Sequence, residues 1–324
     1  RKLKIIKMNK FEDDCRIYEY TSAANPSMSQ IPILGFDSEL HKTGETRIIS
    51  FDLKNELQTN YSATTPNLLA HFIRISAFES IESSANATSQ AFYIIRGNGK
   101  SIIDNQQIIW NEGDLFVVPF VETSIQHFAD SDSAIYWITD EPLMNYLGTK
   151  PSLKKFNLTI FRKERMLAEI EAIKHQEGAE HRNRMGILLG NRITENNTKT
   201  LTHILWSLLN VLPPNDAQRP HRHNSVALDL CVYSPSSNEN INQPGNGVYT
   251  LMGPELDENG WVKNPIRMNW TSGSVFITPP GWWHSHHNET NTPAYVLPIQ
   301  DAGLLTYQRI LDIRFSTDPS IQQS

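Results

Sequence analysis

Histidine is concentrated in two short segments of the second half of the chain. Residues 220–224 read PHRHN, and residues 282–287 read WWHSHH. Alternate residues of a β-strand share a face, so His221 and His223 can converge on one point, and so can His284 and His286. A lone His-x-His on a strand is more often ordinary polarity than a ligand pair. Two such motifs together indicate three imidazoles on one face of a metal's coordination shell, which suits iron, zinc, copper or nickel.

These histidines lie in the second copy of an internal repeat. Four residue types recur with the same spacing, first as Trp110, Gly113, Phe116 and Pro119 and again as Trp270, Gly273, Phe276 and Pro279. Copies this far apart indicate two whole domains rather than a solenoid. Short β-type runs bounded by Gly, Asn, Asp or Pro surround both copies, as is typical of all-β sandwiches and barrels.

Composition and periodicity divide the chain into five parts. An amphipathic pattern over residues 161–174 predicts a helix between the two copies. We expect an N-terminal arm over 1–60, barrel one over 61–147, a helical connector over 148–195, barrel two over 196–316 and a polar tail over 317–324. Two loop-like stretches, 234–247 and 253–265, either cover the mouth of barrel two, extend an oligomer contact or decorate the surface.

The repeated Gly…Phe…Pro segments, the His-x-His and the downstream Trp-His-x-His resemble the motifs of cupin-superfamily bicupins. Within that group the chain is most similar to the gentisate/salicylate 1,2-dioxygenase family, and the resemblance extends through barrel one over residues 91–148. It implies an all-β fold of two tandem cupin barrels, each a double-stranded β-helix or jelly roll, joined by a short helical connector.

The resemblance also implies a site. By that match His221, His223 and His284 would be the metal ligands and His286 a catalytic residue beside the metal that moves protons. The usual cupin glutamate, four or five residues after His223, is replaced by alanine or leucine, which fits the three-histidine subgroup. The family implies Fe(II), with Zn, Mn or Ni as alternatives. Three protein ligands leave up to three positions on an octahedral iron, enough for a bidentate substrate and O₂.

Asp229 departs from the family pattern. Ring-cleaving enzymes of the family carry at this position an arginine that helps to hold the substrate carboxylate. Even spacing places Asp229 on the same strand face as His221 and His223. A carboxylate there opposes an acidic substrate by roughly a kcal/mol or more, so we expect an amine-bearing or neutral hydroxylated substrate. Contact with the substrate and a hydrogen bond to a ligand histidine or an arginine remain alternative roles.

Three more residues are candidates for a substrate pocket. Trp206 and Asn210 share a face of a predicted strand that, in the family, contributes a tryptophan and a polar residue to the pocket. Trp283, next to the third histidine, could line a pocket for a flat substrate, although tryptophan is also ordinary barrel core.

Barrel one lacks these groups. The repeat aligns Ser124 with His284, and a separate alignment of Ala91 with Ala227 places Ala85 and Ala87 at the two histidines of the first motif. His127 lies nearby but alone, and a lone histidine is more often structural. We therefore expect barrel one to be a metal-free packing or dimerisation partner.

The overall composition excludes several classes of protein. The formal net charge is −6, so no basic excess is available to neutralise a nucleic-acid backbone. No uncharged apolar run approaches the ~18 residues of a membrane span, and two cysteines cannot build a disulfide framework. We expect a cytoplasmic homodimer or homotetramer without nucleic-acid or membrane partners.

Together these features predict a non-haem Fe(II)-dependent dioxygenase acting with O₂ on a small hydroxylated, aromatic substrate that chelates the metal. Two alternatives are a metal-dependent cupin isomerase or hydrolase, which would turn over without oxygen, and a cupin that binds a small molecule without catalysis.

Overall fold

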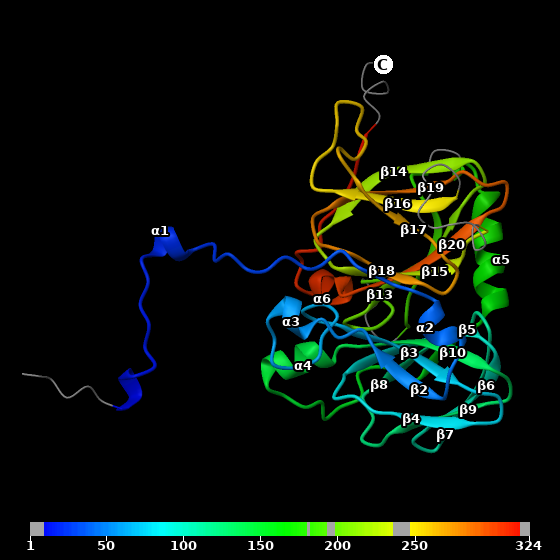
Figure 1. Ribbon diagram of the computed structural model, residues 1–324, viewed down its shortest axis with the longest axis horizontal. Helices are drawn as coiled ribbons and strands as arrows, with labels where there is room; N and C mark the ends of the chain where they lie inside the picture. The colour runs from blue at the N-terminus through cyan, green and yellow to red at the C-terminus, as the bar shows by residue number, and fades with distance from the viewer. Residues whose placement is uncertain (1–9, 180–181, 193–197, 236–246, 318–324) are drawn as a thin grey trace, which may run out of the picture. The chain divides into compact units, whose positions relative to one another are not determined.

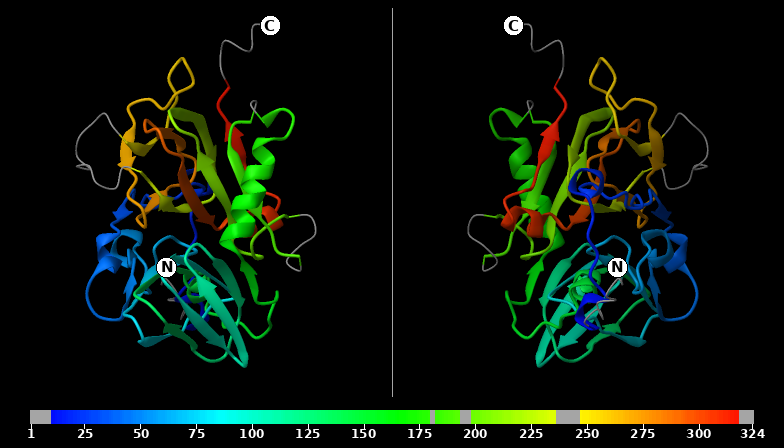
Figure 2. Two further views of the ribbon diagram at one scale, coloured as in Figure 1. Left: turned by 90° about the vertical axis from the view of Figure 1, so that its right-hand side faces the viewer. Right: turned by 90° about the vertical axis from the view of Figure 1, so that its left-hand side faces the viewer.

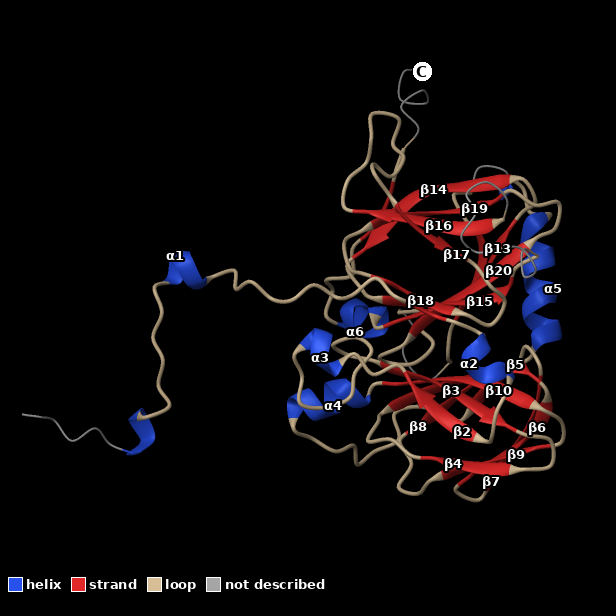
Figure 3. Cartoon of the chain, in the orientation of Figure 1, coloured by secondary structure: helices blue, strands red, loops and turns tan. Residues whose placement is uncertain are grey.

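The computed structural model describes residues 10–179, 182–192, 198–235 and 247–317. The chain divides into two compact units, residues 1–30 and 31–324. The described part of the first unit holds a 3-10 helix, Lys10–Glu12, and a short helix, α1 (Tyr20–Ala23), whose first amides bond to the Glu19 carboxylate. Residues 11–30 are exposed throughout. All the described strands lie in the second unit, which is overwhelmingly β (Figure 3).

Barrel one is built from ten strands: β2 (Arg47–Ser50), β3 (Leu69–Ile75), β4 (Ser80–Ser83), β5 (Ser89–Arg96), β6 (Asn98–Ile103), β7 (Gln106–Asn111), β8 (Leu115–Pro119), β9 (Ile125–Ala129), β10 (Ser133–Thr139) and β11 (Thr159–Phe161). They form a larger sheet in the order β11-β8-β5-β10-β3-β2 and a smaller sheet in the order β4-β9-β6-β7. All pairs are antiparallel, and the two sheets face each other (Figure 1).

Barrel two is built from eleven strands: β1 (Gly35–Phe36), β12 (Met185–Leu189), β13 (Trp206–Leu212), β14 (Asp216–His223), β15 (Ala227–Tyr233), β16 (Val248–Gly253), β17 (Ile266–Asn269), β18 (Val275–Thr278), β19 (Trp283–Asn288), β20 (Ala294–Gln300) and β21 (Ile313–Phe315). One sheet has the order β1-β18-β15-β20-β13-β12 and the other β17-β16-β19-β14-β21. The expected all-β fold of two jelly-roll barrels is confirmed.

The described helices of the second unit are α2 (Glu39–Lys42), α3 (Lys54–Leu57), α4 (Glu141–Leu147), α5 (Lys163–Lys174) and α6 (Ala302–Tyr307). The helix predicted over 161–174 is present as α5, which buries Met166 and Ile170 and packs beside β12 (Figure 2). Across the described residues, no helix combines the length and the apolar character that a membrane crossing demands.

The repeated segment performs the same task in both barrels. Trp110 and Trp270 are fully buried, and each is followed by a glycine in a left-handed turn, Gly113 (φ 86°) and Gly273 (φ 81°). Glycine adopts this conformation without the steric penalty of a Cβ atom. The turn then leads into β8 or β18, the strand that carries the repeated phenylalanine.

The two barrels share one core and differ in their interiors. Alternate residues of β15 and β20, such as Leu228, Leu230 and Leu297, point away from barrel two into an apolar layer that includes Phe72 and Tyr136 of barrel one. A second apolar cluster fills the interior of barrel one. The cluster inside barrel two is smaller and leaves part of the interior to polar side chains. The interior of barrel one is therefore mainly apolar, whereas that of barrel two holds a cavity lined in part by polar side chains.

The domain boundaries differ from those expected. The folded unit begins at residue 31, not 61, because β1 pairs with β18 of barrel two and β2 pairs with β3 of barrel one. The segment 148–195 contains two edge strands, β11 and β12, which join the larger sheets of barrels one and two. Strands this short carry too little periodicity to be recognised in the sequence.

Candidate metal centre

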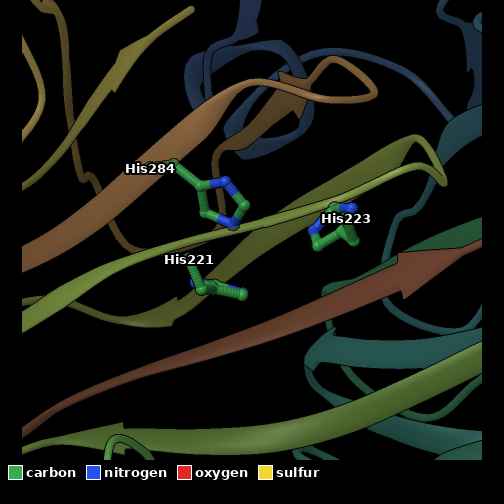
Figure 4. Close-up of side chains that lie close together, drawn as sticks. All are labelled: His221, His223 and His284. Atoms are coloured by element: carbon green, nitrogen blue, oxygen red, sulfur yellow. The ribbon is translucent and has the colours of Figure 1, made fainter. Parts of the chain in front are cut away.

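The three histidines that resemble metal ligands come together from two paired strands. His221 and His223 lie at the end of β14, His284 lies on β19, and His221 is the cross-strand partner of His284. One ligand atom from each residue lies within 4.8 Å of the others. Figure 4 shows the three imidazoles gathered at one place on the inner face of barrel two.

A β-bulge sets this register. Gln218 pairs with His286 and His221 pairs with His284, so β14 has one residue more than β19 between the two pairs. Pro220 lies in the bulge, where its missing N–H breaks no ladder hydrogen bond. A bulge re-aims the side chains that follow it, so both Gln218 and His221 face inward although they are three positions apart, which in a regular strand would put them on opposite faces.

Hydrogen bonds fix the ring orientation of two of the histidines. His223 Nδ1 lies 2.9 Å from the backbone oxygen of Ser225, and His284 Nδ1 lies 3.1 Å from that of Trp282. A carbonyl oxygen can only accept, so each Nδ1 carries the proton and each Nε2 offers a lone pair. This arrangement is the usual support of a metal-bound imidazole, and the residues therefore fit a bound transition metal.

His221 is held differently. Its Nδ1 lies 2.5 Å from Nη2 of Arg184, and because a guanidinium only donates, this nitrogen accepts the hydrogen bond. The proton of His221 then lies on Nε2. Coordination through Nε2 requires the imidazole ring to turn over or Arg184 to withdraw.

Burial keeps all three imidazoles neutral. Desolvation lowers the pKa of His223 to about 4, with its bond to Ser225 opposing the shift, and lowers the pKa values of His221 and His284 well below the ordinary value of 6.5. The neutral form is the one that donates a lone pair to a metal.

The histidines face a cavity of about 210 Å³ between the two sheets of barrel two. Its floor is the inward face of β12, β13, β20 and β15. The cavity-lining residues of this floor are cross-strand partners of one another. One row crosses three strands and holds Gly186, Asn210 and Val296, and the other pairs are Trp206 with Gln300, Leu188 with Leu208, and Asp229 with Pro298. Along each strand these residues are two positions apart, because every second side chain of a barrel strand faces the interior. The expected pocket residues Trp206 and Asn210 thus line the same cavity as the histidines.

His286 also lines the cavity, and its tautomer follows from its partners. The indole N–H of Trp270 donates to Thr250 Oγ1 at 2.8 Å, and the same oxygen lies 2.8 Å from His286 Nδ1. The Thr250 hydroxyl proton needs an acceptor, and Nδ1 of His286 supplies one. The Nε2–H of His286 is then available as a hydrogen-bond donor to a molecule in the cavity.

Asp229 is a buried ionisable group on the cavity floor, with 4% of its surface exposed. Thr278 donates to its Oδ2 at 2.5 Å. Burial raises the pKa of Asp229 to about 7 against the opposing effect of the Thr278 hydrogen bond. The structure therefore places Asp229 inside barrel two with the histidines, but on β15 of the facing sheet and not on the strand face of His221 and His223 that its even spacing predicted.

Trp283 lies elsewhere. Because His284 and His286 face inward, the alternation of β19 directs Trp283 to the opposite face. There its ring packs against the guanidinium of Arg222 at 5.0 Å, and it does not line the cavity. The pocket role expected for Trp283 was wrong.

Sequence reasoning missed the residues supplied by the two edge strands. Arg184, directly before β12, is 37 residues from His221, in the segment interpreted as a connector. Ile313 and Phe315 of β21 line the cavity, and Phe315 pairs with His221. No local motif marks any of these residues.

Arg184 introduces a positive charge into the cavity wall. It donates to the backbone oxygen of Arg219, to Asn183 and to His221, and its Nε is enclosed without a partner. Within the described part of the chain no carboxylate forms an ion pair with it. Desolvation lowers the pKa of Arg184 to about 9, so it remains charged at neutral pH.

Barrel one carries different side chains at the ligand positions. The pair that corresponds to His221 and His284 is Ser83 and Ile125, since β4 pairs with β9 as β14 pairs with β19. The repeat had aligned Ser124 with His284. Ile125 follows Pro119 by one residue more than His284 follows Pro279, which shifts the match by one.

The tryptophan–hydroxyl–imidazole chain is present in both barrels. Trp110 donates to Ser101 at 2.9 Å, and Ser101 contacts His127 Nδ1 at 2.7 Å. His127 Nε2 contacts Ser83 at 2.8 Å, so both ring nitrogens of this fully buried histidine are paired. Phe92 takes the place of Asp229, since each is paired with the repeated phenylalanine, and it stacks on Phe116.

Only part of the long loops can be placed. Residues 236–246 lie outside the described residues. In the second loop, Leu256 and Val262 form a β-bridge, and Trp261 packs against Arg219 and His287. His287 is on the outward face of β19, so this loop does not line the cavity.

Comparison with known proteins gives one partial sequence match and several matches of fold. No protein-family model matches the chain. A 5-aminosalicylate 1,2-dioxygenase from a Comamonas species is 32% identical over 89 residues, and this match covers 28% of the chain and 24% of that relative. The match thus spans about a quarter of the length of the curated relative.

The solved structures agree on the fold. Salicylate 1,2-dioxygenase from Pseudaminobacter salicylatoxidans superposes with a TM-score of 0.68 at 13% identity, covering 94% of this chain and 95% of that one. The adduct of that enzyme with gentisate gives 0.66 at 13% identity, covering 92% and 90%. The chain therefore has the two-barrel fold of salicylate 1,2-dioxygenase and, over 89 residues, resembles 5-aminosalicylate 1,2-dioxygenase in sequence.

Proposed function

We propose that this chain is a dioxygenase that uses non-haem Fe(II), held by His221, His223 and His284, to cleave a small hydroxylated aromatic ring with O₂. The observation that carries the proposal is the convergence of three neutral imidazoles on the wall of a cavity of about 210 Å³. A cavity of about 150 Å³ already admits benzene, so one substituted ring fits. The likeness to salicylate and 5-aminosalicylate dioxygenases favours this chemistry among the reactions that a three-histidine site can support.

The iron would supply the redox chemistry and open positions for substrate oxygens and O₂. The protein's own residues position and polarise the substrate. The floor around Trp206, Leu208 and Val296 is apolar, which orients a flat ring and excludes water from it. His286 presents its Nε2–H to the cavity and so can donate a hydrogen bond, or a proton, to an oxygen atom that gains charge.

Asp229 alone would disfavour an acidic substrate, but Arg184 adds a positive charge to the same cavity. A partly buried guanidinium that forms no ion pair with a carboxylate among the described residues, and that interacts with Asp216 only at longer range, suits an anionic group of the substrate. Its attraction for a substrate carboxylate can therefore offset the repulsion expected from Asp229. We propose a hydroxybenzoate as the substrate class, with its carboxylate on the Arg184 side of the cavity.

Metal analysis of protein purified without oxygen, followed by oxygen-electrode screening of hydroxybenzoates, tests this function. We expect stoichiometric iron and substrate-dependent O₂ uptake, both lost in His221→Ala. His287→Ala is the matched control, because His287 faces outward from β19, the strand that carries His284, and stacks on Tyr249. Stoichiometric zinc without O₂ uptake, or turnover that needs no oxygen, would overturn the proposal.

A further inference from the structure

Asp229 occupies the inner end of the cavity floor. The sheet order β15-β20-β13-β12 places it three strands, or about 14 Å, from the β12 edge. At that edge Leu188 is 43% exposed, and Phe315 on the facing sheet is 52% exposed. The open side of the cavity is thus next to Arg184 and β12, and a ring that enters there points its far edge toward Asp229.

The hydrogen bonding of Asp229 is incomplete. A carboxylate offers about four acceptor sites, and in the described part of the chain the one side-chain donor to it is Thr278. The cavity neighbours on the floor, Pro298 beside it and Val296 in the next row, have no side-chain donors. A buried polar group in this state is completed by a ligand that brings a donor.

The two charged groups of the cavity therefore lie at different ends. Arg184 precedes the edge strand and contacts His221, whereas Asp229 projects from an interior strand. The histidine ligands come from the opposite sheet, β14 and β19. A cation near the entrance and a carboxyl group at the inner end match a ligand with an anionic group at one edge and a hydrogen-bond donor at the other.

We infer that Asp229 is a specificity-determining residue that selects a ring carrying a hydrogen-bond donor, an amino or hydroxyl group, on the edge remote from the carboxylate. This inference rests on the proposed function, because it assumes a hydroxybenzoate in this cavity. The Asp229 carboxyl accepts a hydrogen bond from the donor, and Thr278 holds the carboxyl in place. A substituent of similar size without a donor leaves Asp229 buried and unpaired.

The test compares four ring acids. 5-Aminosalicylate and gentisate carry a donor at the ring 5-position, 5-chlorosalicylate carries a substituent without a donor, and salicylate carries none. We measure O₂ uptake with each compound and, separately, anaerobic binding to the metal-loaded protein from the quenching of tryptophan fluorescence. The variants are Asp229→Leu and the more conservative Asp229→Asn, with melting temperature and metal content as controls for folding.

The wild type should favour the donor-bearing acids by about 10- to 100-fold in kcat/KM and in Kd, the range for a hydrogen bond to a charged group. Asp229→Leu should abolish this preference by weakening the donor-bearing acids while leaving 5-chlorosalicylate unchanged or improved, and Asp229→Asn should retain part of it. The inference would be overturned if the wild type showed the same kcat/KM and Kd for acids with and without the donor, or if the preference remained in both variants. If no acid supports O₂ uptake but binding still shows the Asp229-dependent preference, the proposed function fails and the inference stands.

Discussion

His221 on β14 and His284 on β19 are direct partners across an antiparallel ladder, and their ring centroids lie 4.0 Å apart. The β-bulge between Gln218 and His221 produces this pairing, since a regular ladder continued from the Gln218–His286 pair would place Pro220 opposite His284. Side chains of directly opposed residues meet on one face of the sheet. The convergence of the three imidazoles is therefore a property of strand register, supported by hydrogen bonds from His223 and His284 to backbone carbonyls.

The Thr250 hydroxyl should matter for both stability and catalysis. Thr250→Val leaves the indole of Trp270 without an acceptor and frees the His286 ring, so we expect a loss of about 1–3 kcal/mol in the free energy of unfolding and a fall in kcat at unchanged metal content. Chemical denaturation, metal analysis and steady-state kinetics measure these effects.

Barrel one supplies the control for Thr250. Ser101→Ala removes the equivalent hydroxyl between Trp110 and His127, so it should cost a similar stability without changing kcat. Equal losses of kcat in the two variants would show that the effect of Thr250 is structural.

Arg184 should set the affinity for carboxylated substrates. Removing its charge in Arg184→Met should raise KM by about 10- to 100-fold with a smaller change in kcat, because the ion pair is present in both ground state and transition state. Arg222→Met is the matched control, since Arg222 packs on Trp283 outside the cavity. An unchanged KM in Arg184→Met would contradict the assignment of the carboxylate to this side.

The buried Asp229 should make stability depend on pH. Its pKa is about 7 in the folded chain against 3.8 when exposed, mainly because of burial. Between these values the folded state holds a proton that the unfolded state has released, so the stability contributed by Asp229 falls as pH rises from about 4 to about 7. The free energy of unfolding of Asp229→Asn, taken relative to that of the wild type, should therefore be higher at pH 8 than at pH 5. The expected difference is on the order of a few kcal/mol. Urea unfolding at both pH values measures it, and a difference between the proteins that does not change with pH would refute it.

The sequence predicted what depends on local periodicity. The alternation of β14 and β19 placed His221, His223, His284 and His286 on one side. Even spacing predicted Asp229 on the strand face of His221 and His223, whereas it reaches the cavity from β15 of the facing sheet. The repeat around Trp110 and Trp270 predicted two barrels because both copies use the same left-handed glycine turn.

Features that depend on pairing between distant segments could not be predicted. Arg184 and Phe315 reach the cavity because β12 and β21 join the edges of two sheets, and strands of three to five residues leave no pattern that names their partner. Trp283 was placed in the pocket from its neighbour His284 alone, although alternation directs it outward.

Oxygen-isotope labelling tests the central claim most directly. The iron-loaded protein is incubated with ¹⁸O₂ and the hydroxybenzoate that supports the fastest O₂ uptake, and the product is analysed by mass spectrometry. We expect a ring-opened product that carries both ¹⁸O atoms, with one O₂ consumed per ring and no product from His221→Ala. Product formed without ¹⁸O, or formed equally well under argon, would contradict it.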